Sequence, residues 1–238
     1  MKKLIAILLA ISIFCVFAYG SGSSNDEVDD EVRGEQVAVI ETEAPTEAPT
    51  EAPTEAPAEK EFSLGKVSGI EYKNEFIGIG ISLDSNWVFK TDEEIAEINQ
   101  LTEEYLGEDY KESVSELASF TDMFANSADN LSNVSVTLEK STFANVLSYD
   151  IAAGYKSTFE DVKAAYEQMG YTDIVFTVED ITVDGEVYCA MHTTAKINGF
   201  AMEQYAFTMK CGSYLALVQA TVLGDAGAMS VINSIYHL

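Results

Sequence analysis

Basic residues are scarce in this sequence. The chain carries 13 Lys and Arg against 40 Asp and Glu, which gives a formal net charge of -27. In residues 62–238, 9 Lys stand singly among 27 acidic residues and form no cluster. Binding to phosphate backbones or anionic headgroups depends on Lys and Arg that displace counterions. The composition therefore excludes nucleic acid as a partner and predicts no binding to anionic surfaces by charge.

Histidine is scarcer still, with only His192 and His237 in the chain. Nucleophilic catalysis needs a base beside the nucleophile, and that base is most often histidine. Cys189 lies three residues before His192, and an odd spacing on a strand sends two side chains to opposite faces. We read His192 as a partly buried strand residue and give the penultimate His237 no chemical role. We therefore predict no catalytic residue, no cofactor and no enzyme.

The three cysteines are few and far apart. Exported proteins often form disulfides. The question is therefore whether Cys189 and Cys211 can form one. A two-residue turn at Asn198-Gly199 places Cys189 opposite Thr208, and Cys211 then lies on the other face of the strand pair. A disulfide requires Cα atoms within about 7 Å and converging side chains. The spacing predicts two free thiols.

All four prolines fall in one stretch, EAPTEAPTEAPTEAPA. Residues 21–61 are acidic and lack aromatic residues until Phe62, so they cannot bury enough apolar surface to fold. Proline at every fourth position favours an extended chain of near 3 Å per residue, or about 50 Å for the repeat. We interpret residues 21–61 as a disordered acidic linker whose repeat is a spacer. The alternative is that this segment is a disordered tail whose length has no function.

The only long apolar run opens the chain. Met1-Lys2-Lys3 is followed by a nearly unbroken apolar run from Leu4 to Phe17 and then by small residues at Ala18, Gly20 and Ser21, which is the pattern of a signal peptide. The run is shorter than the roughly 20 residues of a membrane span. Residues 1–20 are therefore predicted to direct export to the cell envelope or the medium. A lipoprotein would need a cysteine where Ser21 stands, so the leader is lipoprotein-like without its acylation site.

Residues 62–238 predict one α+β domain. Strands are expected around residues 66–90, a helix after the capping box Thr91-Asp92-Glu93-Glu94, and a second helix from about Tyr110 that buries Phe120 and Phe124. A strand at 133–140 and a helix from near Ser157 to Gly170 follow. Asp184-Gly185 and Asn198-Gly199 predict tight hairpin turns within a four-strand meander. A last helix from about Asp225 is expected to carry Met229, Ile232 and Ile235.

Three further features have residue types that can bind a ligand or a metal. Asp129 to Asn133 offers oxygen atoms but lacks the glycine and terminal glutamate of a calcium loop, so we predict a turn. Methionines on alternating strands ordinarily fill cores, so we predict no soft-metal cluster from Met191, Met202, Met209 and His192. Trp87 is expected to plug the core rather than to stack on a ligand. No metal site is predicted, and the ligand-binding residues stay unknown.

Three stretches resemble the PsbP-like domains of secreted Gram-positive proteins: YKNEFIGIGISLDSNWVFKTDEEI, FEDVKAAYEQMGYTDI and the meander that ends in GSYLALV. The resemblance covers most of residues 66–238. It implies an α/β/α sandwich with a central antiparallel sheet, shared by PsbP and a Ran-binding nuclear import factor. Ser85-Asn86 replaces the proline that is common before the tryptophan in such domains. No catalytic motif carries over.

These features favour an exported, surface-displayed, noncatalytic binding or assembly module on an acidic proline-rich spacer. Its partner is expected to be an extracellular protein or a neutral ligand. A small extracellular hydrolase that uses carboxylates in a cleft is the first alternative. A carrier of a soluble ligand is the second.

Overall fold

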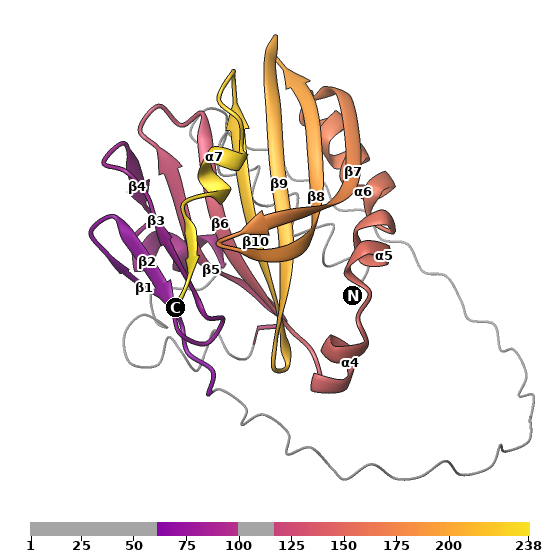
Figure 1. Cartoon of the computed structure of the whole chain (residues 1–238). Coiled ribbons are helices and arrows are strands. Elements are labelled where there is room, and N and C mark those ends of the chain that lie inside the picture. Colours follow the sequence, from indigo (N-terminus) through magenta and orange to yellow (C-terminus); the bar gives the residue numbers. More distant parts are fainter. Residues whose placement is uncertain (1–60, 100–116) are drawn as a thin grey trace, which may run out of the picture.

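Two antiparallel sheets form the body of the protein, shown as a computed structural model in Figure 1. The structure describes residues 61–99 and 117–238. The predicted signal peptide, the linker up to residue 60 and most of the helix predicted from Tyr110 lie outside them. None of the described helices is long and apolar enough to span a membrane.

The large sheet has seven strands in the order β4-β5-β6-β10-β9-β8-β7. The hairpin turns at Asp184-Gly185 and Asn198-Gly199 are confirmed, because all four residues have positive φ as a type I′ turn requires. The meander from β7 to β10 is confirmed with them. The strands are β4 (Trp87–Phe89), β5 (Ser119–Ser127), β6 (Ser132–Lys140), β7 (Thr172–Val183), β8 (Glu186–Ile197), β9 (Phe200–Cys211) and β10 (Tyr214–Leu223).

The helices are short. The capping box at Thr91 is confirmed, with both reciprocal hydrogen bonds to Glu94 present. Thr142 and Asp150 cap two helices that the sequence analysis did not predict, by accepting the backbone N–H three residues on. The helices are α2 (Asp92–Ile98), α4 (Phe143–Ser148), α5 (Ile151–Lys156), α6 (Phe159–Gln168) and α7 (Met229–Ile232).

The small sheet joins the two ends of the domain. Its order is β1-β2-β3-β11, so the C-terminal strand pairs with a strand near residue 80. The prediction that Ile235 lies in the last helix is wrong: α7 ends at Ile232, and Ile235 pairs with Ile81. The strands are β1 (Lys66–Ser68), β2 (Glu71–Asn74), β3 (Ile79–Ser82) and β11 (Ile235–His237).

The prediction that a helix from about Tyr110 extends to Phe120 and Phe124 is also wrong, because both residues lie in β5. The register of β5 against β6 shifts between Thr121 and Met123, which makes Asp122 an extra, bulged residue. A bulge changes the alternation of a strand. Phe120 and Met123 therefore share a face although they are three residues apart, and an apolar spacing of three resembles that of a helix.

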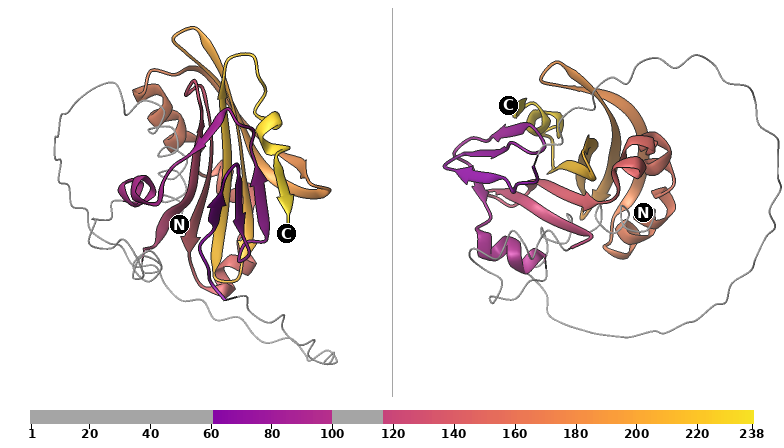
Figure 2. Two further views of the ribbon diagram at one scale, coloured as in Figure 1. Left: turned by 90° about the vertical axis from the view of Figure 1, so that its left-hand side faces the viewer. Right: turned by 90° about the horizontal axis from the view of Figure 1, so that it is seen from below.

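The large sheet separates two cores. One core lies between it and the small sheet with α7, and the other lies between it and helices α5 and α6. Figure 2 shows the sheet curving between these layers. Alternate residues of one strand serve the two cores: Val218 packs toward the small sheet, while Leu217 packs toward the helices. The α+β class with antiparallel strands is thus confirmed.

Candidate functional site

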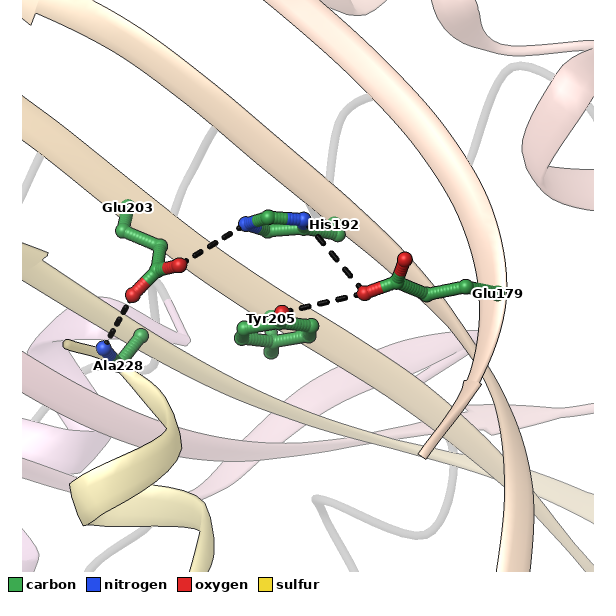
Figure 3. A network of polar contacts seen from close by, with 5 residues as sticks. All are labelled: Glu179, His192, Glu203, Tyr205 and Ala228. Carbon is green, nitrogen blue, oxygen red and sulfur yellow. Dashed lines mark hydrogen bonds and ion pairs between the residues drawn. The ribbon is translucent and has the colours of Figure 1, made fainter. Parts of the chain in front are cut away.

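A histidine held between two glutamates lies on the face of the large sheet that carries α7 (Figure 3). Glu179 comes from β7, His192 from β8, and Glu203 and Tyr205 from β9. The Nδ1 atom of His192 lies 3.5 Å from Glu179 Oε1, and its Nε2 atom lies 3.0 Å from Glu203 Oε1. Both ring nitrogens therefore face a carboxylate.

An aromatic ring also holds the ring of His192 in place. It stacks on Tyr205 with ring centroids 4.2 Å apart and an interplanar angle of 3°. The hydroxyl of Tyr205 donates to Glu179 Oε1 at 3.1 Å. Burial, and then the hydrogen bond to Glu179, raise the pKa of Tyr205 to about 12. Tyr205 thus stays protonated at neutral pH and holds the glutamate in place.

The network continues into the C-terminal segment. The backbone N–H of Ala228 donates to Glu203 Oε2 at 2.7 Å, directly before α7 (Figure 3). Glu203 therefore bridges the imidazole and the start of α7. This arrangement fastens the C-terminal segment to β9 through one carboxylate.

The second histidine has a similar setting on β11. The Nε2 atom of His237 lies 2.8 Å from the Tyr188 hydroxyl, and its backbone N–H donates to Asp184 Oδ2 at 2.8 Å. Its ring nitrogens lie 3.4 Å from Asp184 Oδ2 and from Glu186 Oε2. Both histidines of the chain thus contact carboxylates, and both networks end on a backbone N–H of the C-terminal segment.

An open hollow of about 330 Å³ lies beside Glu203. Thr194 and Lys196 line it from β8, and Asp225 lines it from the turn before α7. The ammonium group of Lys196 is paired with Asp173 at 2.8 Å. The hollow is lined by more apolar than polar surface, and its hydroxyl and carboxylate groups face solvent.

The network can orient and stabilise, but it leaves His192 poorly placed as a base for another group. In residues 61–99 and 117–238, no three His, Cys, Asp or Glu side chains are grouped so as to hold a metal ion. Each ring nitrogen takes part in at most one hydrogen bond, and here both nitrogens face glutamates. The geometry therefore supports a structural role for His192.

Cys189 and His192 lie on opposite faces, as predicted, because Cys189 packs toward the helices while His192 contacts the network beside α7. Burial, and then the nearby Asp180, raise the pKa of the Cys189 thiol. A raised pKa lowers the fraction of reactive thiolate. Cys211 packs on the other core, and no disulfide joins Cys189 and Cys211, as predicted.

The methionines do not come together with His192. Met191 and Met202 are buried in the helix-side core, whereas Met209 packs against the opposite core. They therefore fill two separate cores, in agreement with the prediction. Trp87 is partly buried against the core between the large and the small sheet, also as predicted.

Asp129, Asn130 and Leu131 lie in the turn between β5 and β6, as predicted, whereas Ser132 and Asn133 begin β6. Asp129 Oδ1 accepts from the hydroxyl of Ser127 at 2.6 Å and from the N–H of Leu131 at 3.0 Å. These bonds lower the pKa of Asp129. Oδ1 of Asp129 thus accepts its hydrogen bonds from residues next to it in the turn.

The partners of His192 were not predicted from the sequence. Their signal was available in the hairpins, since the turn that places Cys189 opposite Thr208 also places His192 opposite Tyr205, and the structure has that pair. No sequence motif marks Glu179 and Glu203. Neither lies directly opposite His192 in the strand register, and each reaches it with a long side chain.

Comparison with known proteins gives little further guidance. No model of a known protein family matches the chain, and no curated protein sequence matches it. A crystal structure from Bacteroides thetaiotaomicron VPI-5482 is similar over 72% of this chain, with a TM-score of 0.35 and 11% sequence identity. The match spans 49% of that protein, so this chain covers about half its length. A similarity this low carries no argument about function.

Proposed function

We propose that the protein is an exported, surface-displayed, noncatalytic binding or assembly module. The observation that carries the proposal is the setting of His192, whose two ring nitrogens face Glu179 and Glu203. The cysteine nearest in sequence lies across the sheet with a raised pKa. Among the described residues, the histidines therefore serve the fold rather than a reaction.

The partner is an extracellular protein or a neutral ligand. The acidic domain is repelled by anionic polymers over about one Debye length, roughly 8 Å at physiological salt. The hollow beside Glu203 presents hydroxyl and carboxylate groups, and such groups suit polar contacts with an uncharged partner. The acidic EAPT repeat, if extended, would present the domain away from its attachment.

We also propose membership of the PsbP-like α/β/α domains of exported, lipoprotein-like proteins. Support comes from the antiparallel meander, from α5 and α6 against one face of the sheet, and from α7 with the small sheet on the other. The leader and linker of the sequence support a location in a cell envelope of Gram-positive type or outside the cell.

The proposal is tested by binding the purified chain to intact envelopes. Retention that saturates, is competed by unlabelled chain and is unaffected by rising ionic strength supports it. Retention on anionic wall polymer that salt abolishes would overturn it. Release of sugars or peptides from the envelope, lost in a variant with one carboxylate changed to its amide, would show the alternative hydrolase instead.

A further inference from the structure

The large sheet ends in a long strand whose outer edge pairs with no other strand in residues 61–99 and 117–238. This strand is β7, which pairs with β8 alone and lies at the margin of the sheet in Figure 1. It has 12 residues, whereas β1, β4 and β11, which end the two sheets elsewhere, have 3 each. A long edge presents a row of backbone N–H and C=O groups that can pair with a strand of another chain.

The hairpin turn determines which backbone groups of β7 point outward. Asp184-Gly185 is a two-residue turn, so Val183 and Glu186 pair through backbone hydrogen bonds. In an antiparallel pair, such residues alternate with residues whose N–H and C=O point away from the partner strand. The register of β7 against β8 is regular from Val175 to Val183. The outward groups of this stretch therefore belong to Phe176, Val178, Asp180 and Thr182.

This edge is accessible. Val175 is 55% exposed, and none of residues 172–180 is buried. Helices α5 and α6 pack on one face of the sheet, where the rings of Phe159 and Phe176 stack 5.0 Å apart. In the part of the chain that the structure describes, no hydrogen bond joins the backbone of residues 174–182 to a segment other than β8. The helices thus cover side chains of β7 and leave its outward backbone groups without a partner.

The side chains of β7 decide which kind of strand fits this edge. The strand contains no Lys, Arg or Pro, although lysine and proline are residues that natural proteins use to block an edge. Its charged residues are Asp173, Glu179 and Asp180, and Lys196 already pairs with Asp173. A second copy of this acidic chain would bring like charges to the edge. A basic strand would instead meet charges of opposite sign.

We infer that the outer edge of β7 binds an extended basic segment of a partner protein, which adds to the large sheet as a further strand. Backbone groups of Phe176, Val178 and Asp180 exchange hydrogen bonds with this segment, as in other cases of strand addition. Apolar side chains of the segment lie beside Phe176 and Val178, and basic side chains lie beside Glu179 and Asp180. The inference rests on the proposed binding function and names its surface and the chemistry of its protein partner.

The charges select the partner, and the backbone bonds hold it. Ion pairs at an exposed edge contribute little to affinity and are screened by salt, whereas the backbone hydrogen bonds form between uncharged groups. Retention on the envelope should therefore persist at higher ionic strength, as the proposed function requires.

The test uses a synthetic peptide that is designed to lie antiparallel to residues 175–181, acetyl-Thr-Lys-Lys-Val-Thr-Val-Ile-amide. The ¹⁵N-labelled full chain is titrated with this peptide, and amide hydrogen exchange is measured at saturation. Binding should slow the exchange of the outward N–H groups of Phe176, Val178 and Asp180. The N–H groups of Thr177 and Glu179, which point toward β8, should keep their exchange rates. This alternation distinguishes strand addition from binding to a face of the sheet.

Two N-methylated forms of the peptide provide a matched pair. Methylation of both valine nitrogens removes the N–H groups that face Phe176 and Val178, so binding should be lost. Methylation of the central threonine nitrogen and of the second lysine nitrogen alters N–H groups that point away from β7. This second form should bind as the unmethylated peptide does, because its side chains, charge and facing N–H groups are unchanged.

Charge reversal tests the choice of partner at low ionic strength. Asp180→Lys should weaken the Kd of the basic peptide by about fivefold. The same variant should bind more tightly than wild type to a peptide with Glu in place of both lysines, a gain that loss of folding cannot produce. Glu97→Lys is the control, because Glu97 is exposed on α2, which packs on β5. It changes the net charge equally and should leave both affinities nearly unchanged.

Four results would overturn the inference. The first three are absence of saturation with the basic peptide, equal binding of the two methylated forms, and equal binding of the lysine and glutamate peptides. The fourth is self-association that slows exchange of the same alternate N–H groups without peptide, which would assign the edge to a second copy. Saturable retention of the chain on envelopes would still uphold the broader proposal, so the two failures are distinguishable.

Discussion

The carboxylate of Asp122 accepts a hydrogen bond from the hydroxyl of Tyr72 and so joins the two sheets. Asp122 is the bulged residue of β5, and Tyr72 lies on β2 of the small sheet. Asn74 Nδ2 and the backbone N–H of Gly65 donate to the same oxygen at 2.8 and 3.0 Å. Burial raises the pKa of Asp122 although these three donors oppose the rise.

The raised pKa of Asp122 predicts a pH effect on stability. Its ordinary value is 3.8, so the folded state binds the proton more tightly than the unfolded state, and stability falls as pH rises from that value through the folded pKa. Asp122→Asn removes this dependence. The difference in unfolding free energy, wild type minus variant, should fall over this range in urea titrations at several pH values.

Asp129→Asn is the control of opposite sign. The pKa of Asp129 is lowered, first by Ser127 and then by Leu131, so its contribution is present above 3.8 and is lost as pH falls. The difference in unfolding free energy, wild type minus Asp129→Asn, should therefore rise with pH. Equal slopes for the two variants would contradict the assignment of the buried carboxylate.

Glu139→Gln should stabilise the protein at neutral pH. Glu139 is 5% exposed on β6, and burial raises its pKa. The charged form is therefore disfavoured in the folded state, and the neutral amide should increase the unfolding free energy by about 1 kcal/mol. The gain should vanish at low pH, where Glu139 is protonated in both states.

The control for Glu139 is Glu160→Gln, since Glu160 is exposed in the first turn of α6. Its effect should stay within about 0.5 kcal/mol. Thermal and chemical unfolding measure both variants. A loss of stability in Glu139→Gln would show that the charge of Glu139 is needed.

Glu203→Ala should loosen the C-terminal segment. The change removes the acceptor of the Ala228 N–H, and Ala228 is fully buried. Leaving that donor unpaired should cost about 1–3 kcal/mol. Hydrogen exchange should quicken at Ala228 and through α7. Glu179→Ala, which removes a partner of His192 without touching α7, should leave the exchange of Ala228 slow; equal acceleration would contradict the role given to Glu203.

Both thiols of the domain should alkylate without prior reduction. No disulfide joins Cys189 and Cys211, which pack on different cores. Cys189 should react slowly at neutral pH, because its raised pKa limits the thiolate. Mass spectrometry of the nonreduced chain provides the measurement. A Cys189 to Cys211 linkage would refute the register of the β8-β9 hairpin.

Prediction from sequence worked where the signal was local. The hairpin turns and the Thr91 capping box depend on residues within three positions of each other, and all were found. The sequence failed at β5, where the bulge at Asp122 gave helix-like apolar spacing. The sequence did not show that the amides of Asn133 and Gln219 are buried without a hydrogen-bond partner, because Asn and Gln on a strand look the same in sequence whether they face solvent or a core.

The sequence by itself determined the acidic character, the meander, and the separation of Cys189 from Cys211, since charge, turn conformation and strand alternation are properties of short segments. Only the tertiary structure decided that Ile235 joins β3, that Asp122 meets Tyr72, and that His192 lies between Glu179 and Glu203. These contacts unite residues from different strands, and their existence depends on how two sheets and α7 pack. Such packing is set by the sum of many distant contacts, which no local pattern records.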